Sequence, residues 1–309
     1  MLDLHELQVF LVAAETENFS EAGRRLQISQ PAVSAHIQAL EQHLGTRLFD
    51  RIGRNIKLNE MGEAFVPVVR NLLKEAQQAE QFVAARQGNL TGSVTLGCST
   101  ASGKYILPRI MARFLQQYPE VRTLCHVGPR EMALDQLTNG EVDLAVSSLR
   151  VPRSGIEYRH FADDLIILVA PPDHPWASRD HISLEMLLEC PIILREARSG
   201  TVITLNRELA AHDMSVEMLQ VQVVLCNTES IVQAVIEGIG PAFVSQLAAE
   251  WGLQQGKLIE VPVEGLHLIQ KLYMARHTEF HATETQTCFW DFTFAPENRD
   301  LRPVFNKES

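Results

Sequence analysis

Hydrophobic residues recur every three or four positions through the first 58 residues, a spacing that predicts short helices. The expected helices cover 4–15, 21–26 and 31–44. In the first, one face carries Leu4, Leu7, Phe10, Leu11 and Ala14. Ser20 is the expected cap of the second, because a serine hydroxyl can accept from a free amide of the first turn. The third begins at Pro31, a residue suited to the first helical position, and ends before Gly45.

The third predicted helix has one apolar side and a small polar outer side. Its apolar stripe consists of Val33, Ile37, Leu40 and Leu44. Ser34, Gln38 and Glu41 lie elsewhere on its surface, and a face of this size can enter the major groove of DNA. Residues 48–51 and 54–58 then predict a two-stranded β-wing with a basic tip at Gly53.

A long helix is predicted over 60–87, with Asn59 as its cap. Its apolar residues follow a heptad pattern of alternating gaps of four and three, at Phe65, Val69, Leu72, Ala76, Ala79 and Val83. A small winged domain can hardly bury so long a seam, so we interpret the segment as a dimerisation helix. The alternative is that the seam packs on the body of the same chain.

Residues 89–92 read as a hinge, and after them the pattern changes to alternating strands and helices. Strands are expected at 94–97, 121–127, 142–147, 165–170, 192–194, 221–225, 242–245 and 268–275. Helices are expected at 105–118, 131–138, 184–188, 201–211, 229–237 and 284–292. Such alternation predicts a mostly parallel sheet with right-handed crossovers. Two α/β lobes are indicated, with chain crossings near 163–164 and 262–268, and residues after Pro296 are expected to be frayed.

The predicted fold class is therefore multidomain α+β and α/β: a winged helix-turn-helix, a long linker helix and a two-lobed α/β domain. The expected boundaries are 1–58 for the winged domain, 59–88 for the linker helix and 89–92 for the hinge. Lobe 1 is expected to comprise 93–163 and 268–295, lobe 2 to comprise 164–267, and the tail to comprise 296–309.

Composition and charge describe a globular protein with an unevenly distributed charge. Of 309 residues 46% are hydrophobic, but no apolar run reaches 18 residues, and the N-terminus lacks the basic region of a signal peptide. We therefore expect a cytoplasmic protein. The net charge is −11, yet segment 20–57 carries a charge of +3 from six basic and three acidic residues. A basic head on an acidic body favours a sequence-specific DNA reader.

Cysteine and histidine spacings give no indication of a metal or cofactor. The five cysteines, Cys98, Cys125, Cys190, Cys226 and Cys288, form no CxxC pair and are interpreted as buried free thiols. His277 and His281 are four residues apart but follow a strand end, which disfavours a metal site. No nucleophile–base motif, P-loop or GxGxxG stands in a suitable context, so we do not expect an enzyme or a cofactor.

Several motifs of this chain resemble LysR-type transcriptional regulators. In the head these are Ser20-Glu-Ala-Gly, Ser29-Gln-Pro-Ala-Val-Ser34, Leu44-Gly45, Leu48-Phe-Asp-Arg51 and Leu58-Asn-Glu-Met-Gly62. In the body they are Tyr105-Ile-Leu-Pro108, Phe114 to Pro119, Gly140-Glu-Val-Asp-Leu-Ala145 and Glu237-Gly-Ile-Gly240. The resemblance implies a periplasmic-binding-protein-like effector domain, a homodimer or homotetramer, a double-stranded DNA operator and a small-molecule effector. RNA polymerase is a further candidate partner.

The resemblance places Gln30, Pro31 and Ser34 of the third helix at the DNA groove. Gln38 joins them by helical spacing, while Ser29 or Gln30 caps the helix in an alternative that is compatible with DNA contact. Arg51 and Arg54 are the predicted phosphate or minor-groove contacts of the wing. Glu41 is expected to pair with a neighbour rather than to read a base.

An effector cleft is expected at the carboxyl ends of the strands, where the sheet topology switches. Two hydroxyl-rich turns that open helices there predict an anion site: Ser99, Thr100, Ala101 and Ser102 in one lobe, and Arg198, Ser199 and Thr201 in the other. Further candidates, each also readable as a plain cap or turn residue, are Ser147, Ser148, Asn227, Thr228 and Ser245. Related regulators often carry Gly-Ser-Gly-Thr-Arg here, whereas this chain has Arg198 for the first glycine and Val202 for the arginine.

The sequence thus predicts a DNA-binding regulator of LysR type whose activity responds to a small, anionic metabolite bound between two lobes. The rival interpretations are a cytosolic solute-binding protein without a regulatory role and a two-lobed enzyme. The turn residues and the body also resemble the branch that regulates carbon dioxide fixation and inorganic nutrient assimilation.

Overall fold

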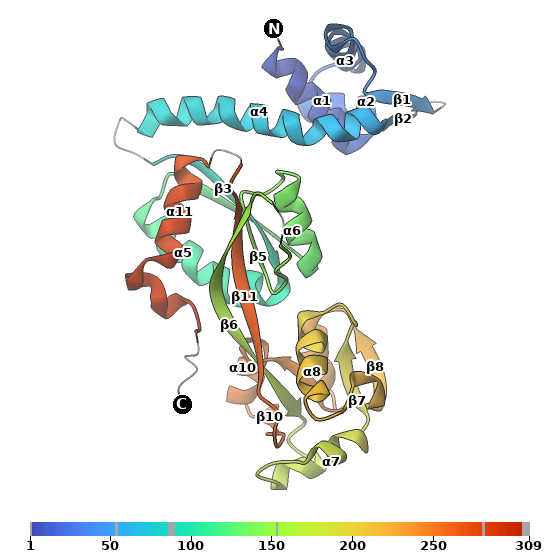
Figure 1. Cartoon of the computed structure of the whole chain (residues 1–309), viewed down its shortest axis with the longest axis vertical. Helices are drawn as coiled ribbons and strands as arrows, with labels where there is room; N and C mark the ends of the chain where they lie inside the picture. The colour runs from blue at the N-terminus through green and yellow to red at the C-terminus, as the bar shows by residue number, and fades with distance from the viewer. Residues whose placement is uncertain (1, 53–54, 86–89, 153, 280–281, 305–309) are drawn as a thin grey trace. The chain divides into compact units, whose positions relative to one another are not determined.

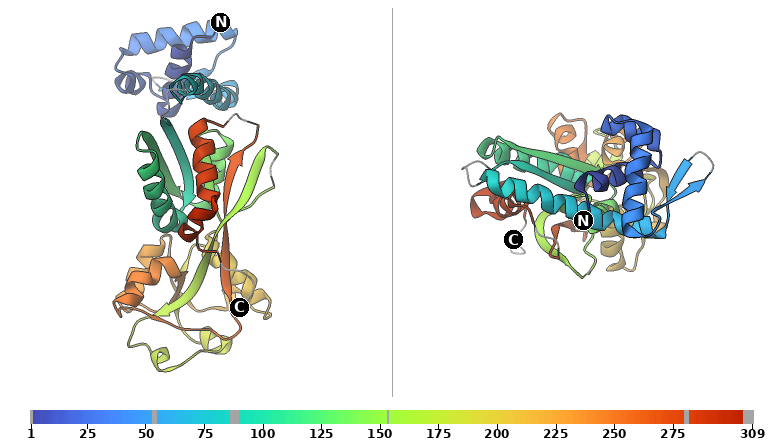
Figure 2. Two further views of the ribbon diagram at one scale, coloured as in Figure 1. Left: turned by 90° about the vertical axis from the view of Figure 1, so that its left-hand side faces the viewer. Right: turned by 90° about the horizontal axis from the view of Figure 1, so that it is seen from above.

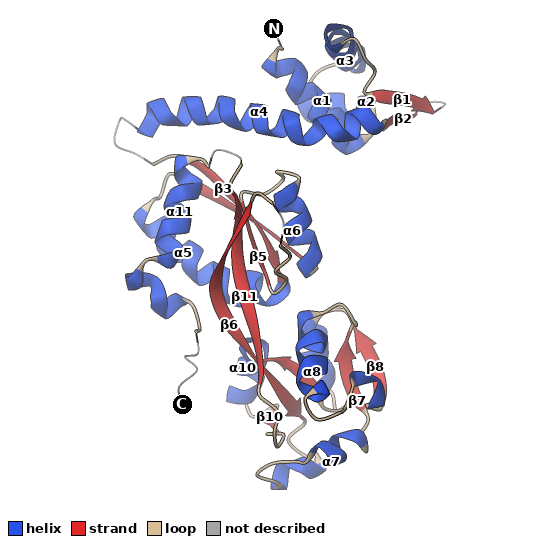
Figure 3. Ribbon diagram, viewed as in Figure 1, coloured by secondary structure: helices blue, strands red, loops and turns tan. Residues whose placement is uncertain are grey.

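The computed structural model describes residues 2–52, 55–85, 90–152, 154–279 and 282–304 (Figure 1). It consists of two compact units, Met1–Leu90 with Asn139–Glu141, and Thr91–Thr138 with Val142–Ser309. The first unit is mainly helical and the second is built on one large sheet (Figure 3).

The first unit is a winged helix-turn-helix followed by a long helix. Its elements are α1 (Leu4–Thr16), α2 (Phe19–Leu26), α3 (Gln30–Leu44), the antiparallel strands β1 (Phe49–Ile52) and β2 (Asn55–Leu58), and α4 (Glu60–Ala85). Asn18, not Ser20, caps α2, because its side chain accepts from the amides of Ser20 and Glu21. Asn59 caps α4 as predicted, accepting from the Gly62 amide at 2.9 Å.

The core of this unit explains why these helices pack. Leu7, Val33, Ile37, Leu40 and Leu48 are at most 2% exposed. Phe10 contacts two rings, Phe49 at 5.6 Å and Phe65 at 5.5 Å between ring centroids. The predicted stripe of α3 is therefore the surface that joins it to α1, and the polar side of α3 is left at the surface.

The first turns of the α4 seam pack within this unit. Val69 is fully buried and Phe65 packs against the same core, so these two seam residues contact the winged domain and not the body of the chain. Leu72 and Ala79 of the predicted seam are exposed along α4, together with Met61 and Val68. The side chain of Val83 lies outside the described residues.

The second unit alternates strands and helices as predicted. Its strands are β3 (Gly92–Ser99), β4 (Val121–Gly128), β5 (Leu144–Ser147), β6 (Ile156–Ala170), β7 (Ile192–Arg195), β8 (Val221–Leu225), β9 (Ala242–Ser245), β10 (Ile259–Glu260) and β11 (Leu268–His277). Its α-helices are α5 (Leu107–Gln117), α6 (Arg130–Thr138), α7 (Leu184–Leu188), α8 (Gly200–Ala210), α9 (Thr228–Ile236), α10 (Gln246–Gln254) and α11 (Glu284–Phe294). A π-helical turn η1 (Ser102–Ile106) precedes α5, and 3₁₀ turns complete the unit: η2 (Pro175–Ser178), η3 (Val216–Met218) and η4 (Pro296–Leu301).

One sheet runs through both lobes in the order β4-β3-β5-β11-β6-β9-β7-β8, with β10 beside β6. The strands are parallel within each lobe, from β4 to β5 and from β9 to β8. The expectation of a mostly parallel sheet is wrong at the centre, where β11 pairs antiparallel with β5 and β6, and β6 with β9. The two long strands β6 and β11 therefore form the connection between the lobes (Figure 2).

The chain crosses between the lobes inside these two strands. Asp163 lies opposite Lys271 and Asp164 lies opposite Gln270 in the antiparallel register. The register thus brings the predicted first crossing, near 163–164, opposite residues 270–271 of β11, which follow the predicted return segment 262–268. The first half of β6 and the whole of α10 were not predicted.

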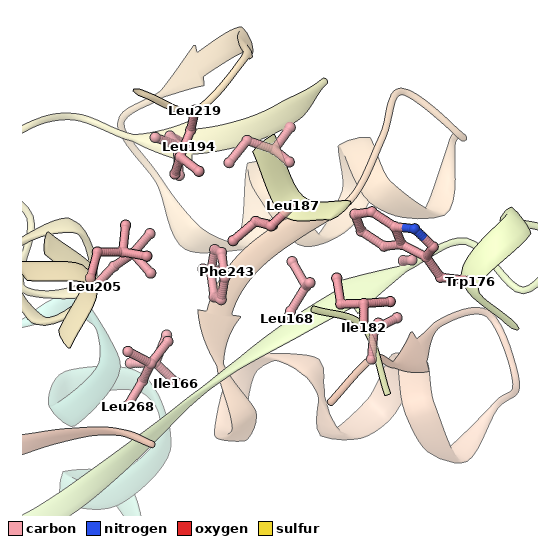
Figure 4. Packing of buried hydrophobic residues seen from close by; sticks show 14 residues of the cluster. Ile166, Leu168, Trp176, Ile182, Leu187, Leu194, Leu205, Leu219, Phe243 and Leu268 are labelled. Carbon is pink, nitrogen blue, oxygen red and sulfur yellow. The ribbon is translucent and has the colours of Figure 1, made fainter. Parts of the chain in front are cut away.

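Lobe 2 has a compact apolar core between its sheet and helices (Figure 4). Leu168 and Phe243, from the paired strands β6 and β9, meet Leu187 of α7 and Leu205 of α8 there. All four side chains are at most 2% exposed. This packing fixes the start of α8, the helix whose first residues were predicted to face the effector cleft.

The C-terminal segment and the cysteines depart from expectation. Residues 296–301 form η4, in which Asn298 and Leu301 are buried, so this part of the predicted frayed tail is ordered. Arg113 of α5 holds Asp300 through two hydrogen bonds of 2.7 and 2.8 Å. Of the five free thiols only Cys98 is fully buried, and Cys226 is exposed.

Candidate functional site

The outer face of α3 carries most of the predicted DNA-binding residues. Gln30, Pro31 and Gln38 are exposed and Ser34 is half-buried. Ser29 caps the helix, its hydroxyl accepting from the Ala32 amide at 3.3 Å. A hollow of about 240 Å³ beside α3 brings Ser34 and Gln38 together with Glu41, Arg47 and the apolar side chains Phe19, Ile37, Phe49 and Ile56.

Glu41 forms hydrogen bonds with the neighbouring main chain. Its carboxylate accepts from the amides of Leu48 and Phe49, at 2.8 and 3.3 Å, which fastens the end of α3 to the beginning of the wing. The prediction that Glu41 pairs with a neighbour is confirmed, and the partner is backbone.

Arg47 is a surface cation that the sequence reasoning did not single out. It is exposed, lines the hollow beside Ser34 and Gln38, and forms no ion pair with any described residue. Arg24 and Arg25 differ, since both reach Glu21, at 2.7 and 3.4 Å. The signal for Arg47 was its place in the basic segment, directly between helix and wing.

The predicted wing contacts are only partly described. Arg51 lies in β1 opposite Ile56, but its side chain is outside the described residues. Arg54 and the tip residue Gly53 also lie outside them. Their role in DNA binding stays a prediction.

A cleft of about 810 Å³ lies between the two lobes of the second unit. Eight of the predicted effector residues line it: Ser99, Thr100, Ala101, Arg198, Ser199, Thr201, Asn227 and Ser245. The structure therefore brings together turns from both lobes, as the topology of the sheet requires.

Ser102 and Ser147 do not line the cleft, and local hydrogen bonds explain why. The Ser102 hydroxyl donates to the Ser99 carbonyl at 3.0 Å inside the π-helical turn. The Ser147 hydroxyl donates to the Arg130 carbonyl at 2.9 Å and accepts from the Leu149 amide at 3.1 Å. Both hydroxyls hold the main chain in place rather than facing the cleft.

The start of α8 is the part of the cleft best suited to bind an anion. Ser199 caps the helix and accepts from the Val202 amide at 3.2 Å, so the first amides of the helix remain at its open end. Arg198, just before the cap, is exposed and has no ion pair within the described chain. The departure from the Gly-Ser-Gly-Thr-Arg run thus places a cation before the helix instead of inside it.

The other cations of the cleft walls are already paired. Arg195 binds both oxygens of Glu196 at 2.7 Å and the Thr228 hydroxyl at 2.7 Å. Lys104 lies 2.8 Å from Glu229. Arg130 lies 3.3 Å from Glu131.

The floor of the cleft contains the candidate Ser148 and two polar residues that the sequence did not indicate, Asp164 and Gln270. Asp164 is 2% exposed, and Ser245 donates to one of its carboxylate oxygens. Burial raises the pKa of Asp164 to about 7, against the opposing effect of that hydrogen bond. Asp164 and Gln270 are adjacent only through the register of β6 and β11, which the sequence pattern does not show.

The described part of the chain contains no group of metal ligands and no membrane-spanning helix. Within the described ranges, three or more His, Cys, Asp or Glu residues are nowhere grouped so that they could hold a metal ion. His281, one of the two histidines considered above, is outside those ranges. Among the helices that the structure describes, none combines the length and the apolar character needed to cross a membrane.

Comparison with known proteins identifies the two units. Residues 4–63 match the bacterial regulatory helix-turn-helix protein family of lysR type, and residues 87–295 match the LysR substrate binding domain. The chain belongs to the LysR family of transcriptional regulators. It is therefore a DNA-binding regulator with an effector-binding domain, as the motifs of its head and body predicted.

This LysR-family chain matches transcriptional regulators over nearly their full length. The HTH-type transcriptional activator CmpR of Synechocystis is 30% identical over 292 residues, which cover 94% of this chain and 95% of CmpR. A RuBisCO operon transcriptional regulator of Acidithiobacillus ferrooxidans is 29% identical, with 94% and 93% covered.

Solved structures show the same fold. A full-length OxyR variant from Pseudomonas aeruginosa superposes with a TM-score of 0.73 at 20% identity, covering 96% of this chain and 95% of the other. The regulatory domain of Synechocystis CcmR, solved in complex with 2-PG, gives a TM-score of 0.60 at 25% identity, covering 66% of this chain and 97% of that domain.

Proposed function

We propose that this regulator reads double-stranded DNA with the outer face of α3 in the major groove. Gln30 and Gln38 are exposed there, and a glutamine side chain can pair with adenine through two hydrogen bonds. Ser29, Pro31 and Ser34 lie along the same face. Arg47 carries a guanidinium that is free to bind a phosphate, and Arg51 and Arg54 of the wing are proposed to do the same.

The salt dependence of DNA binding tests this assignment. The DNA upstream of the chain's own gene is the first fragment to use, in a gel shift repeated over a series of salt concentrations. Arg47→Ala is expected to weaken binding at all sequences and to lower the slope of log affinity against log salt by about one. Arg24→Ala is the matched control, because Arg24 is already held by Glu21. Equal slopes for wild type and Arg47→Ala would remove Arg47 from the interface.

We also propose that the effector is a small anion held between the lobes at the start of α8. The observation that carries this is Arg198, an unpaired cation beside the open amides of Gly200 and Thr201, in a cleft whose other described cations are paired. The turn Ser99–Ala101 faces them across the cleft from lobe 1. A helix N-terminus with a neighbouring guanidinium is a strong site for a carboxylate or phosphate.

Cys226 offers a direct readout of the cleft, since it is exposed and lines the cavity. Anionic metabolites, beginning with 2-PG because CcmR was solved with it, are screened for protection of this thiol from a maleimide. Arg198→Ala and Thr201→Val are expected to weaken that protection at least tenfold and to abolish the effector response of DNA binding. DNA affinity without effector is expected to stay unchanged. Unaltered protection in both variants would contradict the site.

We further infer that two copies pair through α4 and that effector binding acts through this pair. The support is the exposed apolar stripe of Met61, Val68, Leu72 and Ala79, which follows gaps of seven, four and seven residues. Only an effector with different affinities for two arrangements of the pair can change DNA binding, and couplings of about 1–3 kcal/mol are typical. The relatives named above are regulators, which supports a chain without catalytic activity.

A further inference from the structure

The floor of the cleft holds hydrogen-bonding groups that the protein itself leaves unused. One oxygen of Asp164 accepts from Ser245, and its other oxygen has no hydrogen-bond partner within the described chain. Gln270, 8% exposed and directly opposite in the strand register, makes no side-chain hydrogen bond to a described residue. The hydroxyl of Ser148 is buried and is also without a partner.

These groups converge beside the anion wall. A methyl group placed on Gly200, the first residue of α8, would lie 2.6 Å from the Gln270 side-chain oxygen and 2.7 Å from the Ser148 hydroxyl. Both side chains therefore end at one point next to the helix start. Buried polar groups are almost always hydrogen-bonded in proteins, so several unpaired groups at one place indicate a missing partner.

The charges of the cleft limit what that partner is. Arg198 is the one cation of the described cleft wall without an acidic partner, which provides for one anionic group. On the floor no described cation faces Asp164, and its burial disfavours the ionised carboxylate. A second anionic group at the floor would therefore meet an acid and no counter-charge.

We propose that the effector is a small organic acid or phosphate ester that also carries a free hydroxyl group, and that Asp164 selects for this hydroxyl. The inference rests on the anion site of the proposed function and adds the second half of the ligand. A hydroxyl donates one hydrogen bond and accepts others, so it matches the Asp164 oxygen together with the donors of Gln270 and Ser148. An ammonium group has donors only and would leave the Gln270 N–H and the Ser148 O–H unpaired.

The test compares probes that differ only at the proposed group. Lactate is compared with propionate, which lacks the hydroxyl, and with alanine, which replaces it by ammonium. Propane-1,2-diol 1-phosphate is compared with propyl phosphate, so that the two sets distinguish a carboxylate from a phosphate source. Affinities for the full-length protein are measured by calorimetry and by protection of Cys226. The hydroxylated probe of at least one set is expected to bind tenfold or more tightly than its analogues.

Variants assign the preference to Asp164. Asp164→Leu, which removes the polar group, is expected to reduce the tenfold preference to less than twofold while binding of the deoxy probe changes little. Asp164→Asn keeps the shape of the side chain and is expected to reduce the preference in part. It replaces the leucine variant in the test if that variant does not fold. Asp163→Asn is the matched control: Asp163 is 3% exposed and adjacent in β6, but it is bonded to His160 and lines a neighbouring cavity of about 800 Å³ instead of the cleft.

Three results would overturn the inference. Equal affinities within both sets would do so while leaving the anion site intact, because binding would still depend on Arg198. Preference for alanine over lactate would show that the floor binds an ammonium group and not a hydroxyl. Absence of binding by every probe would count against the anion site and this inference together.

Discussion

Removing the Glu41 carboxylate is predicted to loosen the wing from α3. Leu48 and Phe49 are 0% and 5% exposed. In Glu41→Ala their amides lose the acceptor that the carboxylate provides in the described chain. Each unsatisfied buried amide costs roughly 1–3 kcal/mol, and the longer of the two bonds is the weaker, so we expect a loss of about 2–4 kcal/mol. Glu41→Gln keeps an acceptor oxygen without the charge and is expected to lose about 1 kcal/mol.

Hydrogen exchange of the full-length protein is the appropriate assay. All tryptophans and tyrosines lie at or after Tyr105, outside the sequence of the winged domain, so their fluorescence does not report on it. With tenfold per 1.4 kcal/mol, the alanine variant is expected to speed exchange of the Leu48 and Phe49 amides by roughly 30- to 1,000-fold, and the glutamine variant by about fivefold. Exchange in Glu41→Ala at the wild-type rate would refute the role given to this carboxylate.

Three further outcomes are expected. Leu72→Glu places a charge in the exposed stripe of α4 and is expected to shift light-scattering mass toward the monomer, whereas Lys74→Glu, on another side of the helix, is not. Asp164 has a raised pKa, so its contribution to the free energy of unfolding is full below about pH 4 and is lost as the pH rises through about 7. The stability of Asp164→Asn relative to wild type, measured by urea unfolding, is therefore expected to rise over that range. A difference that does not change with pH would contradict this prediction. Iodoacetamide is expected to modify Cys226 first and Cys98 last, since burial and the neighbouring thiol raise the pKa of Cys98; mass spectrometry that finds Cys98 modified early would show that its strand opens.

Local patterns predicted the helices that bury one face and the turns that open a helix. The stripe of α3 and the serine at position 199 belong to this class, because apolar spacing and capping act within a few residues. The cap of α2 was misplaced by two residues, since Asn18 and Ser20 are both good caps and only the observed bonds distinguish them. The boundary of a helix is decided by such small differences.

The floor of the cleft was beyond the reach of local patterns. Asp164 and Gln270 lie inside strands and come together through an antiparallel register that joins distant parts of the chain. The first half of β6 was missed for a related reason: residues 156–160 are at most half-buried and do not form an apolar run. Ser147 and Ser148 were both candidates, because the sequence alone does not say which hydroxyl bonds the main chain and which one faces the cavity.

The central position of β11 in the sheet determines the order in which the parts of the chain can fold during synthesis. Lobe 1 needs this late strand beside β5, and it needs α11, whose Thr285 and Gln286 bond the carbonyls of Thr91 and Asp143. The helix-turn-helix has all of its residues long before then, and lobe 2 is complete before the chain returns to lobe 1. During translation the helix-turn-helix is therefore able to fold first. The effector cleft forms last, because lobe 1 cannot fold until β11 and α11 have left the ribosome. A prematurely terminated chain would carry a DNA reader without a sensor.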